Sequence, residues 1–131
     1  MTNTKNCGVS CPVDKALDLI NKKWTIQIIR DLFFGKKHFK EFLENKPGLS
    51  NKVLSNCLKT MEENNLIGKK VLSTSPVTTE YYLTDLGRSM NKIIYELAMF
   101  TLDKCDYEEY ENVELNKNIK NNFKKTLNIE E

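Results

Sequence analysis

The chain has 131 residues, of which 40% are hydrophobic and 29% charged, and its formal net charge is +2. This length suits one domain with its own core, and the composition is that of a folded rather than a disordered protein. No apolar run approaches the ~20 residues of a membrane-spanning helix, and the first ten residues lack the apolar stretch of an export signal. We therefore expect a cytoplasmic protein with no membrane partner.

The charge is distributed unevenly along the chain. Residues 1–80 carry 13 Lys/Arg against 8 Asp/Glu (net +5), whereas residues 81–131 carry 7 against 10 (net −3). A basic front half suits contact with a polyanion, although two ordinary solvated surfaces would show the same bias. Five glycines and one histidine leave little material for a nucleotide loop or a metal site, and no nucleophile–base pair is apparent. We expect no cofactor, no metal and no enzyme activity.

The first half of the chain predicts four helices, because its apolar residues recur at helical spacing. The first helix begins at Pro12, whose missing N–H costs nothing in a first turn. The second contains Trp24, which we expect in the core, and stops at Gly35. With four helices predicted in its first half, we expect the chain to be mainly helical.

The third and fourth helices are separated by the turn dipeptide Pro47-Gly48. Ser50 can then cap the fourth helix by accepting a hydrogen bond from a first-turn N–H, and Asn64-Asn65 ends it. The positions predicted to form the buried face of this helix are Val53, Leu54, Cys57, Leu58 and Met61.

A β-hairpin and one long helix are predicted to follow. Residues 66–72 and 79–83 are rich in β-forming side chains, and the segment between them is polar and turn-like. Thr84 can cap the long helix. Its apolar stripe is too wide for the remaining chain to cover, which suggests a partner chain. The stripe consists of Leu86, Met90, Ile93, Ile94, Leu97, Ala98, Thr101 and Leu102.

The last segment, residues 107–131, leaves two interpretations open. Leu115, Ile119, Phe123 and Leu127 repeat every four residues, as in a helix, but chain ends often fray. We divide the chain into a flexible arm (1–10), a helical domain with a small hairpin (11–106) and a C-terminal extension (107–131) that is either a helix or a frayed tail.

Two short helices, a tight turn and a hairpin make a winged helix-turn-helix, whose second helix enters the major groove of DNA. Asparagine can pair with adenine through two hydrogen bonds, and lysine can donate to guanine. No Asp or Glu occurs on the exposed face of this helix before Glu62, so phosphates would not be repelled. The residues predicted to read bases are Asn51, Lys52, Ser55, Asn56 and Lys59.

A second set of residues is suited to phosphate contacts, which give affinity without sequence information. The set consists of Lys36, Lys37, His38, Lys40, Ser50, Lys69 and Lys70. Double-stranded DNA is therefore the expected partner. A winged helix that contacts only protein is the alternative, and a merely solvated helix face would carry similar residues.

Several motifs resemble those of the HxlR-type winged-helix regulators, in order and at the spacing expected over residues 11–104. They are Cys11-Pro12, Lys23-Trp24-Thr25, the Phe-Lys-Glu-Phe-Leu segment 39–43, the Pro-Gly-Leu-Ser-Asn-Lys-Val-Leu segment 47–54 and the Glu-Tyr-Tyr-Leu-Thr-Asp-Leu-Gly segment 80–87. The resemblance implies a homodimeric transcriptional regulator with a fold related to MarR proteins, acting on a palindromic operator in response to an effector still to be identified.

In that family the N-terminal and long C-terminal helices form the dimer. The resemblance therefore implies that the dimer contacts are Leu17, Ile20, Met90, Ile93, Ile94, Leu97 and Thr101.

Four cysteines are too few and too dispersed for a secreted disulfide scaffold. Cys57 falls on a core face and is expected to be a small buried hydrophobe. Cys11 opens a helix, where the dipole stabilises a thiolate, and several members of the resembled family sense oxidants or electrophiles at this position. Our hypothesis is that Cys11 is such a sensor, with Cys7 or a cysteine of the second subunit able to resolve it. An unreactive Cys11 in a regulator with another signal is the alternative.

Overall fold

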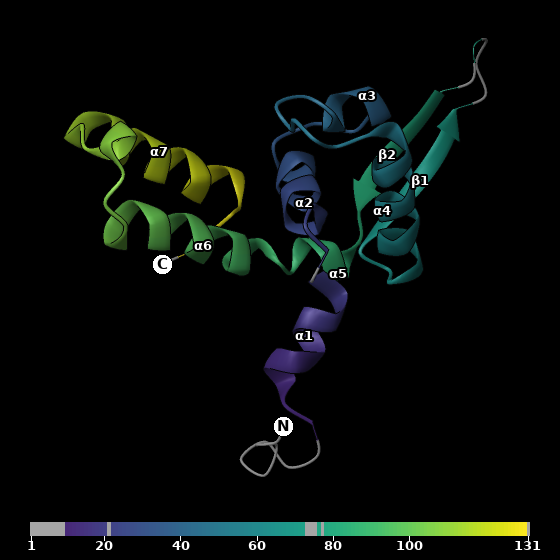
Figure 1. Ribbon diagram of the computed structural model, residues 1–131, viewed down its shortest axis with the longest axis horizontal. Helices are drawn as coiled ribbons and strands as arrows, with labels where there is room; N and C mark the ends of the chain where they lie inside the picture. The colour runs from purple at the N-terminus through teal and green to yellow at the C-terminus, as the bar shows by residue number, and fades with distance from the viewer. Residues whose placement is uncertain (1–9, 21, 73–75, 77, 131) are drawn as a thin grey trace.

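A computed structural model describes residues 10–20, 22–72, 76 and 78–130 (Figure 1). The prediction of a mainly helical chain with a small hairpin is confirmed. The expected N-terminal arm and Cys7 lie, apart from Ser10, outside the described residues. In chain order the elements are α1 (Pro12–Ile20), α2 (Thr25–Phe33), α3 (Phe39–Phe42), α4 (Asn51–Glu63), β1 (Ile67–Leu72), β2 (Thr78–Leu83), α5 (Asp85–Arg88), α6 (Asn91–Lys104), the 3-10 helix η2 (Glu108–Tyr110) and α7 (Val113–Thr126).

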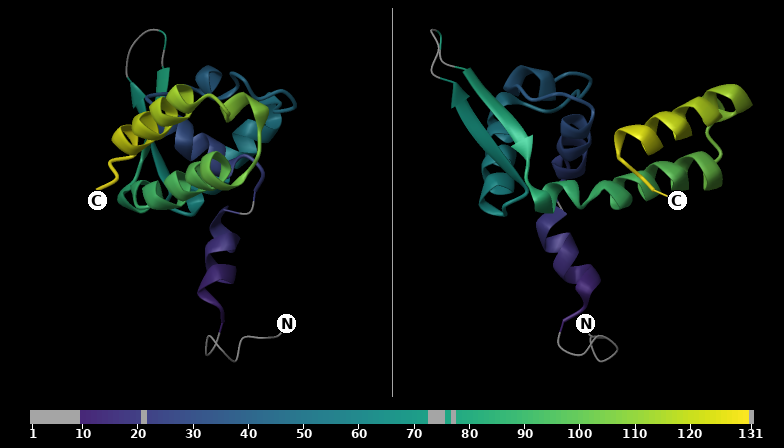
Figure 2. Two further views of the ribbon diagram at one scale, coloured as in Figure 1. Left: turned by 90° about the vertical axis from the view of Figure 1, so that its left-hand side faces the viewer. Right: turned by 180° about the vertical axis from the view of Figure 1, so that it is seen from behind.

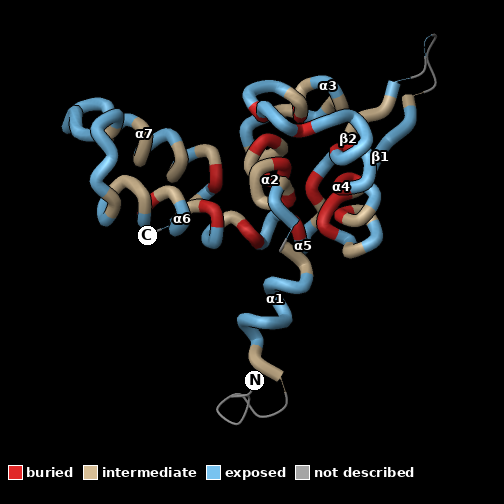
Figure 3. The backbone as a smooth tube through the Cα atoms, in the orientation of Figure 1, coloured by how far each residue is buried: buried red, intermediate tan, exposed pale blue. Residues whose placement is uncertain are grey.

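The core lies where α2, α3, α4 and the hairpin meet (Figure 3). Ile28 and Ile29 of α2 are fully buried against Phe42 of α3 and Leu54 of α4. Burying side chains of this size stabilises the fold by about 1.5–3 kcal/mol each. Trp24 packs partly buried at the edge of this cluster, which agrees with its predicted core position.

The α3–α4 turn brings the two helices together in the predicted helix-turn-helix. Gly48 has φ +93°, a conformation that suits glycine and few other residues. The Ser50 hydroxyl accepts a 3.1 Å hydrogen bond from the Val53 N–H, which confirms the predicted cap. At the other end Asn65 has φ +61° and ends α4 where the sequence predicted.

The hairpin is antiparallel, with Ile67 opposite Leu83 and Lys70 opposite Glu80. Its strands begin and end within one residue of the predicted bounds. The segment before α3 is fastened to it, since the Tyr81 N–H donates to the Lys37 carbonyl at 2.8 Å. The start of the helix-turn-helix and the hairpin therefore form one unit.

The prediction of a single long helix after the hairpin was wrong. The Thr84 hydroxyl caps α5 through the Gly87 N–H at 3.1 Å, as expected, but Ser89 and Met90 separate α5 from α6. The Ser89 hydroxyl donates to the Leu86 carbonyl at 2.6 Å, and the Met90 N–H bonds only three residues back. Such local bonds compete with regular helix bonds and break the helix.

Gly87 lies against the start of β1. A Cβ at this position would come within 2.2 Å of the Leu66 carbonyl oxygen, a backbone atom that has no room to move. The same carbonyl accepts from the Thr84 hydroxyl at 3.0 Å and from the Thr84 N–H at 3.2 Å. Helix α5 is thereby packed closely on the start of β1.

The C-terminal extension forms a helix, so the frayed-tail interpretation was wrong for the described residues. Helix α7 lies alongside α6 in every view (Figures 1 and 2). Its end is anchored: Leu127 is fully buried in the core, and its carbonyl accepts from the Asn91 side chain at 2.8 Å. Phe123 meets Phe34 edge to face at 5.2 Å between ring centroids.

A buried ion pair joins α2 to the turn that precedes α4. The Lys46 ammonium donates to the Asp31 carboxylate, and each residue is only 4% exposed. Arg30 donates to the other oxygen of Asp31 at 2.9 Å. The Leu49 N–H in turn bonds the Lys46 carbonyl at 3.1 Å. The pair therefore helps to fix where α4 begins.

Helix α1 projects from the rest of the structure, and none of its residues is buried (Figures 1 and 3). Val13 is 63% exposed and Leu17 48% exposed on it. None of the described helices combines the length and apolar character required to cross a bilayer.

Candidate nucleic-acid interface

The five predicted base-reading residues are all exposed on α4. They are Asn51, Lys52, Ser55, Asn56 and Lys59. The opposite side of the helix is buried through Leu54, Leu58 and Met61, which holds the polar side outward. Val53, predicted for the core, is instead 43% exposed because it lies at the margin of the buried side.

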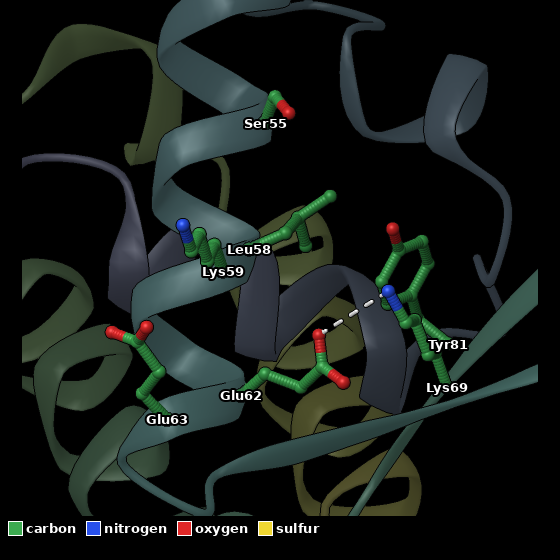
Figure 4. A pocket seen from close by; sticks show the side chains of 7 residues that line it. All are labelled: Ser55, Leu58, Lys59, Glu62, Glu63, Lys69 and Tyr81. Carbon is green, nitrogen blue, oxygen red and sulfur yellow. Dashed lines mark ion pairs between the residues drawn. The ribbon is translucent and has the colours of Figure 1, made fainter.

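The acidic residues of α4 are confined to its C-terminal end. There the Glu62 carboxylate pairs with the Lys69 ammonium of β1 at 3.8 Å (Figure 4). The pair spans a hollow of about 490 Å³ between α4 and the hairpin, whose walls include Ser55, Lys59 and Tyr81. Lys69, predicted to contact phosphate, is thus held toward α4 with part of its charge neutralised, a pairing that local sequence patterns cannot reveal.

The basic segment before α3 is also paired with acids. Lys36 lies 3.4 Å from Glu44, and Lys37 lies 3.5 Å from Glu80. His38 contacts Glu80 at 3.8 Å through Nε2 and the Thr79 carbonyl at 3.3 Å through Nδ1. Lys37 and His38 thereby join the start of α3 to the hairpin, a role that the sequence did not show.

Glu41 fixes the start of α3. Its carboxylate accepts the backbone N–H groups of Lys37 and His38, both at 2.8 Å. These two hydrogen bonds lower the pKa of Glu41 below its ordinary value, with a smaller contribution from the nearby cations. The carboxylate therefore stays ionised as a helix cap at neutral pH.

Three of the described residues predicted to contact phosphate form no ion pair with a carboxylate. Among the described residues, Lys40 and Lys70 are exposed and have no carboxylate within ion-pair distance. The Ser50 hydroxyl accepts the cap hydrogen bond and keeps its own hydrogen to donate. Lys40 lies on α3, Ser50 caps the start of α4, and Lys70 lies on β1 of the hairpin.

The cysteines occupy three different environments. Cys57 is buried, and burial raises the pKa of its thiol despite the opposing Thr25 hydroxyl and Lys22, which agrees with the predicted role as a small hydrophobe. Cys11 immediately precedes α1 and Cys105 follows α6, and both are half-buried. Within the described part of the chain no three His, Cys, Asp or Glu side chains are grouped to hold a metal ion.

The predicted dimer contacts divide into three groups by burial. Leu17, Ile93 and Leu97 are exposed, whereas Met90 and Ile94 are buried in the core of the chain itself and so leave the set of candidate contacts. Both belong to the cluster of buried side chains that forms the core. Ile20 and Thr101 are half-buried. The sequence missed two strongly exposed apolar side chains, Val13 and Phe100.

Residues 19–109 match the model of the family described as HxlR-like helix-turn-helix. The protein belongs to the HxlR family. Members of this family are DNA-binding transcriptional regulators and not enzymes, which agrees with the winged helix-turn-helix described above.

Two Bacillus subtilis proteins illustrate the similarity to other HxlR regulators. The uncharacterized HTH-type transcriptional regulator YvaP is 34% identical over 102 residues, which cover 77% of this chain and 94% of YvaP. The HTH-type transcriptional regulator YodB is 34% identical over 97 residues, which cover 73% of this chain and 87% of YodB.

Solved structures of HxlR-type regulators agree with the fold. The redox regulator HypR in its oxidized form has a TM-score of 0.68 at 29% identity, covering 74% of this chain and all of HypR. The reduced form of YodB has a TM-score of 0.63 at 33% identity, covering 75% of this chain and 97% of YodB. These similarities extend over the winged helix but leave about a quarter of the present chain uncovered.

Proposed function

We propose that this HxlR protein is a homodimeric, sequence-specific regulator that places its two α4 helices in successive major grooves of a palindromic operator, about 34–36 Å apart. The observation that carries the proposal is the exposed polar side of α4. It presents amides, hydroxyl and ammonium groups with no carboxylate until the helix's last turns, and its opposite side is locked into the core. Such a surface matches base edges flanked by phosphates.

A second copy of the chain is the proposed cover for the exposed apolar surfaces. Ile93, Leu97 and Phe100 of α6 line an almost wholly apolar hollow of about 550 Å³, and α1 exposes Val13 and Leu17. Soluble monomers rarely leave contiguous apolar patches uncovered. In a two-fold dimer, the same surface of each subunit would cover the other.

Cys11 is the proposed sensor of oxidants or electrophiles. It lies at the start of α1 and is half-buried, so a small reagent can reach it. HypR and YodB, which resemble this chain in sequence and fold, have been solved in oxidized, reduced or diamide-treated forms. The start of α1 and the end of α6 lie far apart in every view (Figures 1 and 2). A disulfide from Cys11 would therefore join it to Cys7 or to a cysteine of the second subunit.

Genome-wide footprinting, with and without an oxidant, tests the function as a whole. We expect short protected sites with two-fold symmetry whose occupancy changes on oxidation. The absence of any protected site would favour the alternative of a winged helix that contacts only protein. The operator found in this way is the probe for the variants that follow.

Asn56→Ala is expected to reduce discrimination between the operator and a shuffled duplex by about 5- to 150-fold, because a lost bidentate base contact is worth about 1–3 kcal/mol. Lys70→Ala should instead weaken binding to both duplexes about equally and reduce the salt slope by about one. Fluorescence anisotropy at several salt concentrations measures both quantities.

Lys117→Ala, an exposed substitution on α7, is the matched control and should change neither quantity. If Asn56→Ala and Lys70→Ala both behave like this control, the proposed surface is wrong. Lys69→Ala should have a smaller effect than Lys70→Ala, because Glu62 already neutralises part of its charge.

Cys11→Ser is expected to abolish the effect of diamide on operator binding. Disulfide formation removes two electrons and two protons from a pair of thiols, and diamide accepts them. Anisotropy before and after treatment gives the response, and a non-reducing gel shows whether the chains become linked. Cys57→Ala serves as the control and should respond like the unchanged protein, since its thiol is buried. A normal response from Cys11→Ser would place the sensor elsewhere.

A further inference from the structure

A further hollow lies on the flank of α4 that faces the N-terminal end of α2. Its volume is about 300 Å³, at the lower end of the range for small-molecule sites, with room for about ten water-sized groups. One wall comes from the α1–α2 connection and the other from α4. The residues that bear on the argument are Lys22, Lys23, Trp24, Val53, Asn56 and Cys57.

The charge of this hollow is positive and uncompensated. Lys22 and Lys23 both line it, and none of its described lining residues is acidic. Within the described part of the chain, neither lysine has a carboxylate at ion-pair distance. An anion entering the hollow would therefore meet two ammonium groups that no carboxylate pairs with, one of which, that of Lys23, lies over the Trp24 ring.

Three of the other lining side chains, those of Trp24, Val53 and Cys57, are apolar, beside the polar Asn56 and Thr60. The Trp24 indole lines the hollow, with the Lys23 ammonium 4.8 Å from its ring centroid, and the partly exposed Val53 side chain lies opposite on α4. Cys57 is buried, and burial raises the pKa of its thiol, so it adds an apolar wall and no nucleophile. An occupant would be held without a covalent bond.

We infer that this hollow binds a small planar organic anion, of the class of the aromatic carboxylates, whose ring packs against Trp24 and Val53 while its carboxylate pairs with Lys22 and Lys23. Phosphates of DNA would use the lysines but leave the indole and the valine without a partner. A neutral aromatic compound would leave the two ammonium groups unused. A planar anion satisfies both parts of the hollow.

The site also gives a route to regulation, which rests on the proposed DNA-binding function. Asn56 lines the hollow and is one of the five residues proposed to read bases. A bound anion that engages the Asn56 amide, or adds negative charge beside α4, opposes binding of the DNA polyanion. Occupancy of the hollow should therefore weaken operator binding.

The test uses the full chain labelled with ¹⁵N and the probe 2-naphthoate. Because the chain has one tryptophan, its indole N–H gives a single NMR signal that reports on the hollow. We expect 2-naphthoate to shift this signal saturably. The neutral analogue 2-naphthamide should bind at least about tenfold more weakly. Acetate, which lacks the ring, should give no saturable shift of this signal. An unmoved signal, or equal binding of acid and amide, would overturn the inference.

The double variant Lys22→Gln/Lys23→Gln should raise the Kd for 2-naphthoate about tenfold, as expected for two partly exposed ion pairs. Lys117→Gln/Lys125→Gln carries the same charge change on α7 and should leave the Kd unchanged. If both double variants bind the probe alike, the lysines do not form the site.

Operator binding with and without the probe separates the two proposals. A saturable indole shift with no operator binding at all would retain the ligand site and remove the DNA-binding function. Operator binding that 2-naphthoate weakens in the unchanged protein, but not in Lys22→Gln/Lys23→Gln, is the result expected if both hold. If 2-naphthoate fills the hollow but leaves the affinity for the operator unchanged, the regulatory link is wrong.

Discussion

Replacing Asp31 with alanine should lower the free energy of unfolding by about 3–5 kcal/mol, because it leaves the Lys46 ammonium buried without its counter-charge. The loss of two further hydrogen bonds from Arg30 adds little, since that side chain can turn to solvent. Urea unfolding followed by circular dichroism measures the change.

The double variant Asp31→Leu/Lys46→Met tests whether the stability lost in Asp31→Ala comes from leaving one buried charge unpaired. Replacing both charges with apolar groups of similar size removes the desolvation penalty together with the attraction, so its stability should lie much closer to that of the unchanged protein. A double variant as unstable as Asp31→Ala, or an Asp31→Ala protein within about 1 kcal/mol of the original, would show that the pair is exposed to water in solution.

Leu127→Ala should cost about 2–5 kcal/mol, as for other fully buried leucines, because the residue is 0% exposed although it lies four residues from the chain's last one. Leu115→Ala at the other end of α7 is the matched control. That side chain is 45% exposed, so its removal should stay within about 0.5 kcal/mol. Equal small effects for the two variants would mean that α7 is a frayed tail in solution.

The order of the elements could be predicted because local signals mark it. Pro12, Ser50 and Thr84 each mark a helix start that the structure confirms, and Asn65 ends α4 as predicted. These signals act within a few residues of chain, where sequence spacing determines geometry.

What could not be predicted depends on contacts between distant segments. Helical spacing identified an apolar side of the predicted long helix but not which residues the same chain would cover, so Met90 and Ile94 were assigned to a partner. The pairing of Lys37 with Glu80 joins residues more than forty positions apart, and no local pattern shows it. The exposed polar side of α4, proposed to read bases, was predictable because one helix carries all of it.

The close fit of Gly87 against the Leu66 carbonyl has a mechanical consequence. It fixes α5, which leads from the hairpin to α6, against the segment that enters β1. In the dimer proposed above, a change in the angle between α6 and the hairpin would therefore have to arise at Ser89 and Met90, between α5 and α6, and not where α5 meets β1.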